Sequence, residues 1–181
     1  MTRAAVLAPG YGGTAQQPIL RSLSRALADV GIDTEAITFS TRGRRPSRGY
    51  ESELADLRAA YARLRQGHDA VALVGRSFGG RMCAFLAERE PPDALAIVGH
   101  PISPAGRPRP RDEAALAAIT CPTLVVQGDR DELGPLAVLE RIAGQNAHVD
   151  LVVIAHAGHE LGAHESEAVA HVARWLDAVL R

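Results

Sequence analysis

The chain has 181 residues, 46% of them hydrophobic and 23% charged, and its formal net charge at pH 7 is −1. These values are ordinary for a globular protein long enough to bury a sizeable core. The near-zero charge and the 4% aromatic content argue against nucleic acid as a partner. All 20 basic residues are arginines, which excludes Schiff-base chemistry, a pyridoxal-phosphate lysine and the lysine of a phosphate-binding loop.

Apolar runs are short along the whole chain. The first segment, MTRAAVLAPGYGG, has too short an apolar run for a signal peptide, and no stretch is long enough to span a membrane. Cys83 and Cys121 form neither a metal-ligand pair nor a disulfide framework, and both are interpreted as packing residues. We therefore expect one cytoplasmic domain, residues 1–181, with no membrane partner; the sequence indicates no oligomeric state.

Strands and helices alternate in the predicted secondary structure. The predicted strands are the apolar runs Ala4–Ala8, Thr34–Phe39, Ala70–Val74, Ala94–Val98, Thr123–Gln127 and Val149–Ile154. The predicted helices are Pro18–Val30, Glu51–Gln66, Arg81–Arg89, Asp112–Ile119, Leu136–Ala143 and Ser166–Leu180. Because buried strands that alternate with helices indicate a parallel sheet covered on both faces, we predict an α/β protein, a three-layer α/β/α sandwich with about six mainly parallel strands.

Ser77 lies between the third predicted strand and the following helix, within Gly75-Arg76-Ser77-Phe78-Gly79. This G-x-S-x-G pattern is typical of a strained strand-to-helix turn that lifts a serine hydroxyl above a sheet. Glycine is needed on both sides because side chains there would collide across the turn. A glycine-rich connection with an incidental serine is the alternative, and the flanking strand and helix favour the strained turn.

A serine hydroxyl needs an imidazole to take its proton and a carboxylate to orient that imidazole. In a parallel sheet, the loops at the carboxyl ends of the strands carry the site. The loop after the fifth strand supplies Asp131, and the loop after the sixth supplies His159. The order Ser, Asp, His is that of the α/β-hydrolase arrangement, so these residues are the candidate catalytic triad.

Neighbouring residues offer alternatives for the acid and the base. Asp129 directly follows its strand and suits a turn-capping role, so Asp131 is favoured. His156 is closer to its strand than His159 and is interpreted as structural. A zinc site built from His156, His159 and His164 is disfavoured, because HELGAH is one residue too long for H-E-x-x-H and has a glycine in the middle. We therefore expect no metal and no cofactor.

Two backbone amides are candidates for an oxyanion hole. The N–H of Phe78 follows the nucleophile at the positive end of a helix. The N–H of Tyr11 lies in the loop Gly10-Tyr11-Gly12-Gly13 after the first strand, where glycines let the backbone turn inward. The alternative for this loop is a glycine-rich turn with no role in catalysis.

These motifs resemble those of a known family. PGYGG (9–13), GRSFGGRM (75–82), GHPISPAGRP (99–108), ITCPTLVVQGDRDELG (119–134) and AGHEL (157–161) are similar to segments of small α/β-hydrolases without a lid, in the dienelactone-hydrolase-related group that includes testis-expressed 30-like domains. The resemblance implies a minimal α/β-hydrolase fold with Ser77 as nucleophile, Asp131 as acid and His159 as base. The chain departs from the pattern at Pro9, where many α/β-hydrolases carry histidine before the oxyanion glycine. Arg76 stands before the serine and is compatible with catalysis.

Two predicted loops beside Ser77 are rich in arginine. They contain Arg42, Arg44, Arg45 and Arg48 after the second strand, and Arg107, Arg109 and Arg111 after the fourth. Guanidinium groups there would favour an anionic substrate, such as a carboxylate-bearing ester or an acyl-CoA thioester. A solvated surface with no binding role is the alternative.

The sequence therefore predicts a serine hydrolase, of the carboxylesterase or thioesterase kind, that acts on a small ester or thioester. No inserted segment is long enough for a large lid, so we expect an open cleft suited to small or polar substrates. Two alternatives stay open: a non-catalytic interaction module with the same fold, and an acyltransferase that uses the same three residues.

Overall fold

A parallel sheet forms the centre of the computed structural model, which describes residues 1–181. Its six strands are β1 (Arg3–Ala8), β2 (Asp33–Ala36), β3 (Ala70–Arg76), β4 (Ala94–Val98), β5 (Thr123–Gly128) and β6 (Val149–Ile154). They lie in the order β2-β1-β3-β4-β5-β6. The strand order reverses between β1 and β3, because the chain leaves β1 outward to β2 and returns on the other side. Such a switch point is where open α/β sheets bind ligands.

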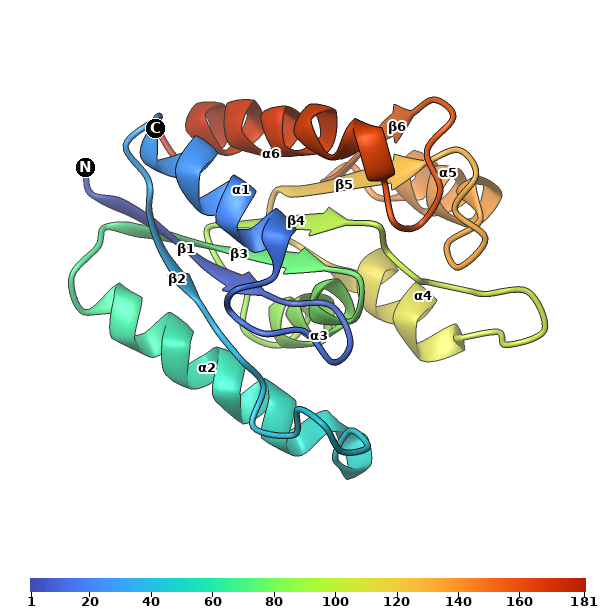
Figure 1. The fold of residues 1–181 in the computed structure, drawn as a ribbon, viewed down its shortest axis with the longest axis horizontal. Helices are drawn as coiled ribbons and strands as arrows, with labels where there is room; N and C mark the ends of the chain where they lie inside the picture. Colours follow the sequence, from blue (N-terminus) through green and yellow to red (C-terminus); the bar gives the residue numbers. More distant parts are fainter.

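Helices cover both faces of the sheet (Figure 1). They are α1 (Pro18–Ala28), α2 (Glu51–Arg65), α3 (Phe78–Ala87), α4 (Pro110–Ala118), α5 (Leu136–Gln145) and α6 (Glu165–Val179). Helices α1 and α6 pack on one face, and α2 to α5 pack on the other. The predicted three-layer α/β/α sandwich is confirmed. No helix combines the length and the apolar character needed to cross a bilayer.

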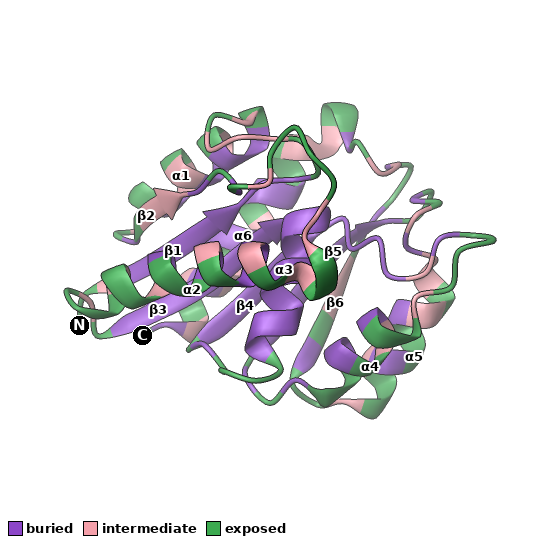
Figure 2. Cartoon of the chain, turned by 90° about the horizontal axis from the view of Figure 1, so that it is seen from below, coloured by how far each residue is buried: buried purple, intermediate pink, exposed green.

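Side chains of the central strands alternate between two apolar cores. Leu73 of β3 packs in the core under α2 and α3, whereas Ala72 and Val74 pack in the core under α1 and α6. This alternation follows from the two-residue period of a strand. Because both faces are covered, every residue of β3, β4 and β5 is buried. Figure 2 shows that α3 is buried along its whole length.

The second strand is shorter than predicted and ends at Ala36 rather than at Phe39. The N–H of Ile37 still reaches the carbonyl of Leu7 at 3.0 Å. However, β1 ends at Ala8, so the residues that follow have no strand to pair with. Phe39 is nevertheless buried, and its ring meets that of Phe78 edge to face, with centroids 5.6 Å apart. Phe39 is therefore apolar because it packs against Phe78, and not because it belongs to a strand.

Two helices begin at least two residues earlier than predicted, and α6 begins one residue earlier, at Glu165. Helix α3 starts at Phe78, directly after Ser77, instead of at Arg81. Helix α4 starts at Pro110 instead of Asp112. Proline suits the first position of a helix, because its fixed φ is helical and its missing N–H would have no intrahelical partner there. The early start of α3 leaves one residue, Ser77, to make the whole turn from strand to helix.

Candidate active site

Ser77 is the only residue between β3 and α3, and its backbone has φ 50° and ψ −113°. Positive φ is rare for a residue with a side chain, because Cβ then crowds the backbone. The surrounding structure holds Ser77 in this conformation: its N–H donates to the carbonyl of Val98 in β4 at 3.0 Å, and its carbonyl accepts from Arg81 N–H at 3.1 Å. Ser77 is therefore fixed in a strained turn at the carboxyl edge of the sheet.

Two glycines make this turn possible, for different reasons. A Cβ on Gly75 would overlap the backbone of Gly80 across the turn, which is the collision that the sequence pattern predicts. A Cβ on Gly79 would instead overlap the carbonyl groups of Ala8 and Pro9. Gly79 thus lets the start of α3 lie directly against the end of β1. The turn and the loop after β1 are held close together as a result.

The three candidate triad residues are joined by hydrogen bonds. Ser77 Oγ lies 2.8 Å from Nε2 of His159, and Nδ1 of the same ring lies 2.9 Å from Oδ2 of Asp131. With Nδ1–H donating to the carboxylate, Nε2 is left to accept from the serine hydroxyl. The side chains of His159 and Asp131 are only 12% and 1% exposed, which protects both contacts from competing water.

The carboxylate of Asp131 is itself held by neighbours. Gln127 Nε2 donates to Oδ2 at 2.8 Å, and the N–H of Leu133 donates to Oδ1 at 2.9 Å. Asp129, the alternative acid, is exposed, and its backbone N–H pairs with Ile154 at 3.0 Å. Of the two candidate acids, the structure therefore places only Asp131 against the imidazole.

The other two histidines of the final loop do not converge on the serine. His156 is exposed, and its Nδ1 lies 2.8 Å from Nη2 of Arg130. His164 lies 3.6 Å from Glu167 at the start of α6. No group of three or more histidine, cysteine or acidic side chains is arranged to hold a metal ion.

Arg76, the residue before the serine, is buried under the loop that carries His159. Its Nη2 donates to the backbone carbonyl of His159 at 2.5 Å, and its Nη1 donates to the carbonyl of Val98 at 3.4 Å. Nη1 also lies 3.4 Å from Nε2 of the His159 ring. Burial lowers the pKa of Arg76, although Glu160 and Asp131 act in the opposite direction. Arg76 thus ties the end of β3 to the histidine loop.

The two candidate oxyanion donors lie beside the serine. Phe78 is the first residue of α3, so its N–H has no intrahelical acceptor. Tyr11 follows β1, and its ring meets that of Phe78 edge to face with centroids 5.8 Å apart. Both residues line the same pockets, one of which also contains Ser77. The aromatic contact places the two segments next to each other on one side of the serine.

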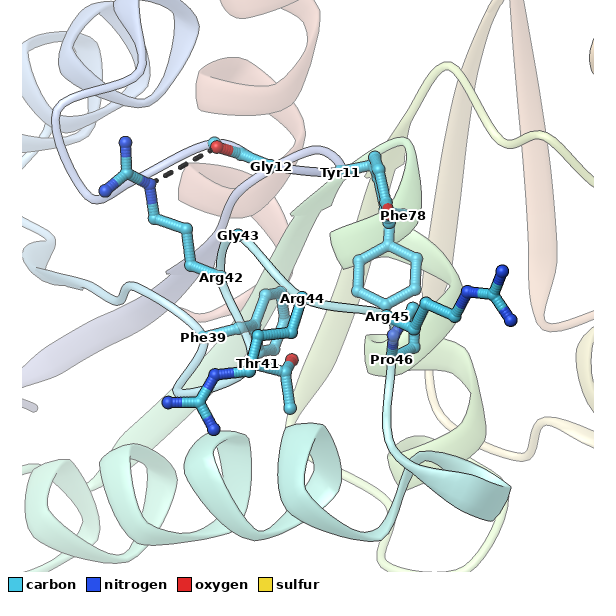
Figure 3. Close-up of a pocket in the computed structure, with 11 residues that line it drawn as sticks. Tyr11, Gly12, Phe39, Thr41, Arg42, Gly43, Arg44, Arg45, Pro46 and Phe78 are labelled. Carbon is cyan, nitrogen blue, oxygen red and sulfur yellow. Dashed lines mark hydrogen bonds between the residues drawn. The ribbon is translucent and has the colours of Figure 1, made fainter.

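Two adjacent pockets share Tyr11, Pro46 and Phe78. The first, of about 390 Å³, is here called the loop pocket and is lined by Tyr11–Gly13, Phe39, Thr41–Pro46 and Phe78 (Figure 3). The second, of about 380 Å³, is called the serine pocket and is lined by Tyr11, Pro46, Tyr50, Ser77, Phe78, Arg81, Pro101, Arg107, Arg109 and Leu133. Only the serine pocket contains the hydroxyl.

Five of the seven candidate arginines line these pockets, whereas Arg48 and Arg111 line neither. Arg42, Arg44 and Arg45 line the loop pocket, where their guanidinium groups splay in three different directions (Figure 3). Arg107 and Arg109 line the serine pocket beside Ser77. The sequence does not distinguish the two loops, whereas in the structure only Arg107 and Arg109 of these arginines line the pocket that contains Ser77.

Sequence reasoning missed Arg81, which lines the serine pocket from α3. Its guanidinium makes a two-pronged pair with the buried carboxylate of Asp112, in which Nη2 lies 3.1 Å from Oδ2. Nη2 also donates to Tyr50 Oη at 3.1 Å. The signal was present in GRSFGGRM, where an arginine stands on the first turn of the predicted elbow helix.

Beside this pair lies His100, which is fully buried and whose ring nitrogens have no hydrogen-bond partner in the chain. Burial, together with the positive charges of Arg81 and Arg109, lowers the pKa of His100 to about 3. Its backbone N–H is satisfied by Gln127 Oε1 at 2.7 Å. His100 is thus a neutral imidazole within the wall of the site.

The chain is similar to known proteins over nearly its full length. A family model described as an alpha/beta hydrolase domain matches residues 1–180. No curated protein sequence matches the chain. Among solved structures, an alpha-beta serine hydrolase homologue from Coxiella burnetii has a TM-score of 0.82 and 25% identity, and the match covers 97% of this chain and 86% of that one.

Two further structures share the fold at lower identity. An α/β serine hydrolase without a lid, from Xanthomonas campestris, has a TM-score of 0.77 at 24% identity and covers 96% of this chain and 82% of its own. Dienelactone hydrolase from Anabaena variabilis has a TM-score of 0.77 at 24% identity and covers 98% of this chain and 84% of its own.

Proposed function

The chain belongs to the α/β hydrolase family, as its motifs predict, and we propose that it is a serine hydrolase that cleaves a small ester or thioester. One observation carries the proposal: an unbroken line of hydrogen bonds runs from Ser77 Oγ through the imidazole of His159 to the buried carboxylate of Asp131. A serine held in this way can lose its proton as it attacks, which an isolated hydroxyl does poorly near neutral pH.

In the first half-reaction, Ser77 Oγ forms a bond to the acyl carbon while His159 Nε2 takes the hydroxyl proton. The carbonyl oxygen becomes an oxyanion, and the N–H groups of Phe78 and Tyr11 are the donors that we propose for it. The bond to the leaving oxygen or sulfur then breaks, and His159 returns the proton to it. The products of this step are a free alcohol or thiol and an acyl group on Ser77.

In the second half-reaction, water replaces the departed alcohol or thiol. His159 takes a proton from the water as its oxygen bonds to the acyl carbon, and the bond to Ser77 Oγ then breaks. The proton returns to the serine, and the carboxylic acid leaves. Asp131 stays ionised throughout and holds the imidazole in the tautomer that accepts from the hydroxyl.

A fluorophosphonate probe tests the nucleophile directly. We expect the wild type to be labelled at Ser77 and Ser77→Ala to be unlabelled, with p-nitrophenyl ester hydrolysis lost in parallel. Asp131→Asn should lower kcat by about four orders of magnitude, because the neutral amide no longer favours the required tautomer. Asp129→Asn and His156→Gln are matched controls in the same two loops and should keep the wild-type rate. A well-folded wild type that neither reacts nor turns over would refute the proposal.

The same experiments separate the two alternative functions. An interaction module with an idle site would fold normally, resist the probe, and lose a protein partner when the arginine loops are changed. An acyltransferase would react with the probe, but its product would be an acylated acceptor rather than a free acid. Product analysis by mass spectrometry therefore distinguishes transfer from hydrolysis.

A further inference from the structure

Two guanidinium groups in the serine pocket have no carboxylate partner. Arg107 and Arg109 both line the pocket that contains Ser77, and neither forms an ion pair within the chain. Arg81, the third arginine of the pocket, is already engaged by Asp112. No acidic residue lines the pocket. The wall beside the hydroxyl therefore has an excess of positive charge.

The surroundings of Arg109 show that this charge is not neutralised from behind. The residue is half-buried, and its Nη1 donates to the backbone carbonyl of Pro101 at 2.6 Å, a neutral acceptor. Burial lowers the pKa of Arg109, and the nearby cation of Arg81 lowers it further, although Asp112, which is paired with Arg81, acts in the opposite direction. With Nη1 fixed on Pro101, Nη2 and Nε are left to donate to a ligand. A guanidinium restrained in this way is suited to a planar, two-oxygen anion.

We propose that the serine pocket binds a carboxylate of the substrate, so that the substrate is a half-ester or half-thioester of a small dicarboxylic acid. This inference rests on the proposed hydrolase function and adds the class of acyl group. The size of the pocket favours a carboxylate over the phosphates of an acyl-CoA. At about 380 Å³, it lies near the lower end for ligand sites, so the anion it holds must be only a few bonds from the reacting carbonyl.

The loop pocket is a poorer candidate for this role. Its three arginines point apart, one of them donates to the carbonyl of Gly12 at 3.4 Å, and Ser77 does not line it. An anion bound there would not lie beside the nucleophile in the same cavity. The two pockets can therefore be separated by substitution.

The decisive comparison uses three esters of the same chain length. They are the half-ester mono-p-nitrophenyl adipate, its neutral methyl diester, and p-nitrophenyl hexanoate. Adipate is chosen because its chain is longer than that of shorter dicarboxylic acids, which limits spontaneous attack of the free carboxylate on the ester. We expect the wild type to have a kcat/KM for the half-ester at least about tenfold above those for the neutral esters, as one charge-assisted hydrogen bond allows.

Two variants place the effect in the serine pocket. Arg107→Gln changes an exposed side chain whose loop is held by backbone contacts, and we expect it to reduce the preference for the half-ester by about fivefold or more. The double variant with Arg109→Gln should abolish the preference while hexanoate hydrolysis persists. Arg89→Gln, just past the far end of α3, is the matched control and should leave all three rates unchanged.

The outcomes distinguish this inference from the proposed function. Hydrolysis of hexanoate with no preference for the half-ester overturns the carboxylate site but leaves the hydrolase intact. A preference that survives the double variant but is lost in Arg44→Gln also overturns it, because the anion would then bind in the loop pocket. Higher rates on acyl-CoA thioesters than on the half-ester would make the phosphates, rather than a carboxylate, the recognised group. If no ester is cleaved and Ser77 resists the fluorophosphonate, the proposed function itself fails.

A binding measurement gives a second readout that does not need turnover. Ser77→Ala should bind the half-ester in calorimetry more tightly than the methyl diester, with the difference lost when Arg107 and Arg109 are both changed. Equal binding of the charged and neutral esters by Ser77→Ala would overturn the inference.

Discussion

The two arginine-bearing loops beside the site are held by opposite arrangements of charge. In the loop after β2, a buried acid, Glu53 of α2, accepts hydrogen bonds from Thr41 and Ser47, and the arginines extend outward. In the loop after β4, a buried arginine, Arg81 of α3, pairs with Asp112 where the loop enters α4. The first loop is organised around neutral donors, and the second around an ion pair.

This difference explains why, of two loops that are both rich in arginine, only the loop after β4 contributes arginines to the serine pocket. A carboxylate that binds hydroxyl and backbone groups leaves Arg42, Arg44 and Arg45 without a carboxylate partner. An ion pair made by Arg81 of α3 instead holds the second loop against the helix that begins at Phe78, directly after Ser77. Arg111 follows, with its guanidinium 4.4 Å from the centroid of Phe85. The number of arginines in a loop therefore does not indicate whether they line the serine pocket. The buried group that holds the loop in place, Glu53 in one case and Arg81 in the other, accounts for the difference.

The largest expected effect comes from breaking the ion pair. Asp112→Asn leaves the cation of Arg81 buried without its partner, and we expect a loss of about 3 to 5 kcal/mol in the free energy of unfolding. Urea denaturation followed by circular dichroism measures it. The neighbouring Glu113→Gln breaks only the half-exposed pair with Arg141 and should cost less than about 1 kcal/mol. Equal losses in the two variants would contradict the distinction between them.

A smaller effect follows from His100 in the same loop. Its pKa of about 3 lies below the ordinary value of 6.5, so in acid the unfolded chain takes up a proton that the native state does not. Stability is thus full above pH 6.5 and falls as pH decreases toward 3, by up to about 1.4 kcal/mol per pH unit from this group.

His100→Leu is the test of this expectation. The leucine should remove that part of the acid dependence, and it should also stabilise the protein because two unpartnered buried nitrogens disappear. Urea denaturation between pH 4.5 and 7.5 measures both quantities. The control is His148→Gln at an exposed position before β6. An unchanged slope in His100→Leu would show that His100 is not the group responsible.

The smallest effect is expected from Glu53 in the other loop. Burial alone would raise its pKa, but hydrogen bonds from Ser47 and Thr41 outweigh burial and hold the pKa below the ordinary value of 4.5. Its contribution is therefore present above pH 4.5 and is lost as pH falls through the lowered pKa. Glu53→Gln should cost about 1 to 2 kcal/mol at pH 7, and the difference from wild type should shrink in acid.

The matched control is Glu51→Gln, an exposed acid on the first turn of α2. It should be within about 0.5 kcal/mol of wild type at every pH. Urea denaturation at pH 7 and pH 4 is sufficient. If the difference in free energy of unfolding between Glu53→Gln and wild type grows in acid, the lowered pKa of Glu53 would be contradicted.

Much of the fold was predictable because apolar periodicity is local. The strand before Ser77, the serine itself, and the acid and imidazole after β5 and β6 all follow from short patterns and from one rule about sheet edges. That strand runs two residues further than predicted, to Arg76 instead of Val74. The structure joins these three side chains by hydrogen bonds, and their catalytic roles stay a prediction. Asp131 rather than Asp129 lies 2.9 Å from His159, because a residue farther into the loop can reach across to the histidine, and its role as the triad acid stays a prediction.

The remainder depends on contacts between distant segments. The pair of Arg81 and Asp112 joins residues from α3 and α4, and each reads alone as an ordinary polar helix residue. The burial of Arg76 depends on the final loop covering it, which no pattern near Arg76 encodes. The early end of β2 depends on where β1 stops. In each case the deciding neighbour is far away in the sequence.

Gln127, on β5, links the acid to the loop that shapes the serine pocket. One side-chain amide donates to Asp131 Oδ2 and to the carbonyl of Gly134, while its oxygen accepts from the N–H of His100. A displacement of the loop after β4 is therefore transmitted to the group that orients the imidazole. We therefore expect substitutions that change substrate selection also to change the rate of the proposed reaction. Substitutions near His100 that reshape the serine pocket should alter kcat as well as KM. A variant with altered specificity would keep its rate only if the side-chain amide of Gln127 stayed in place.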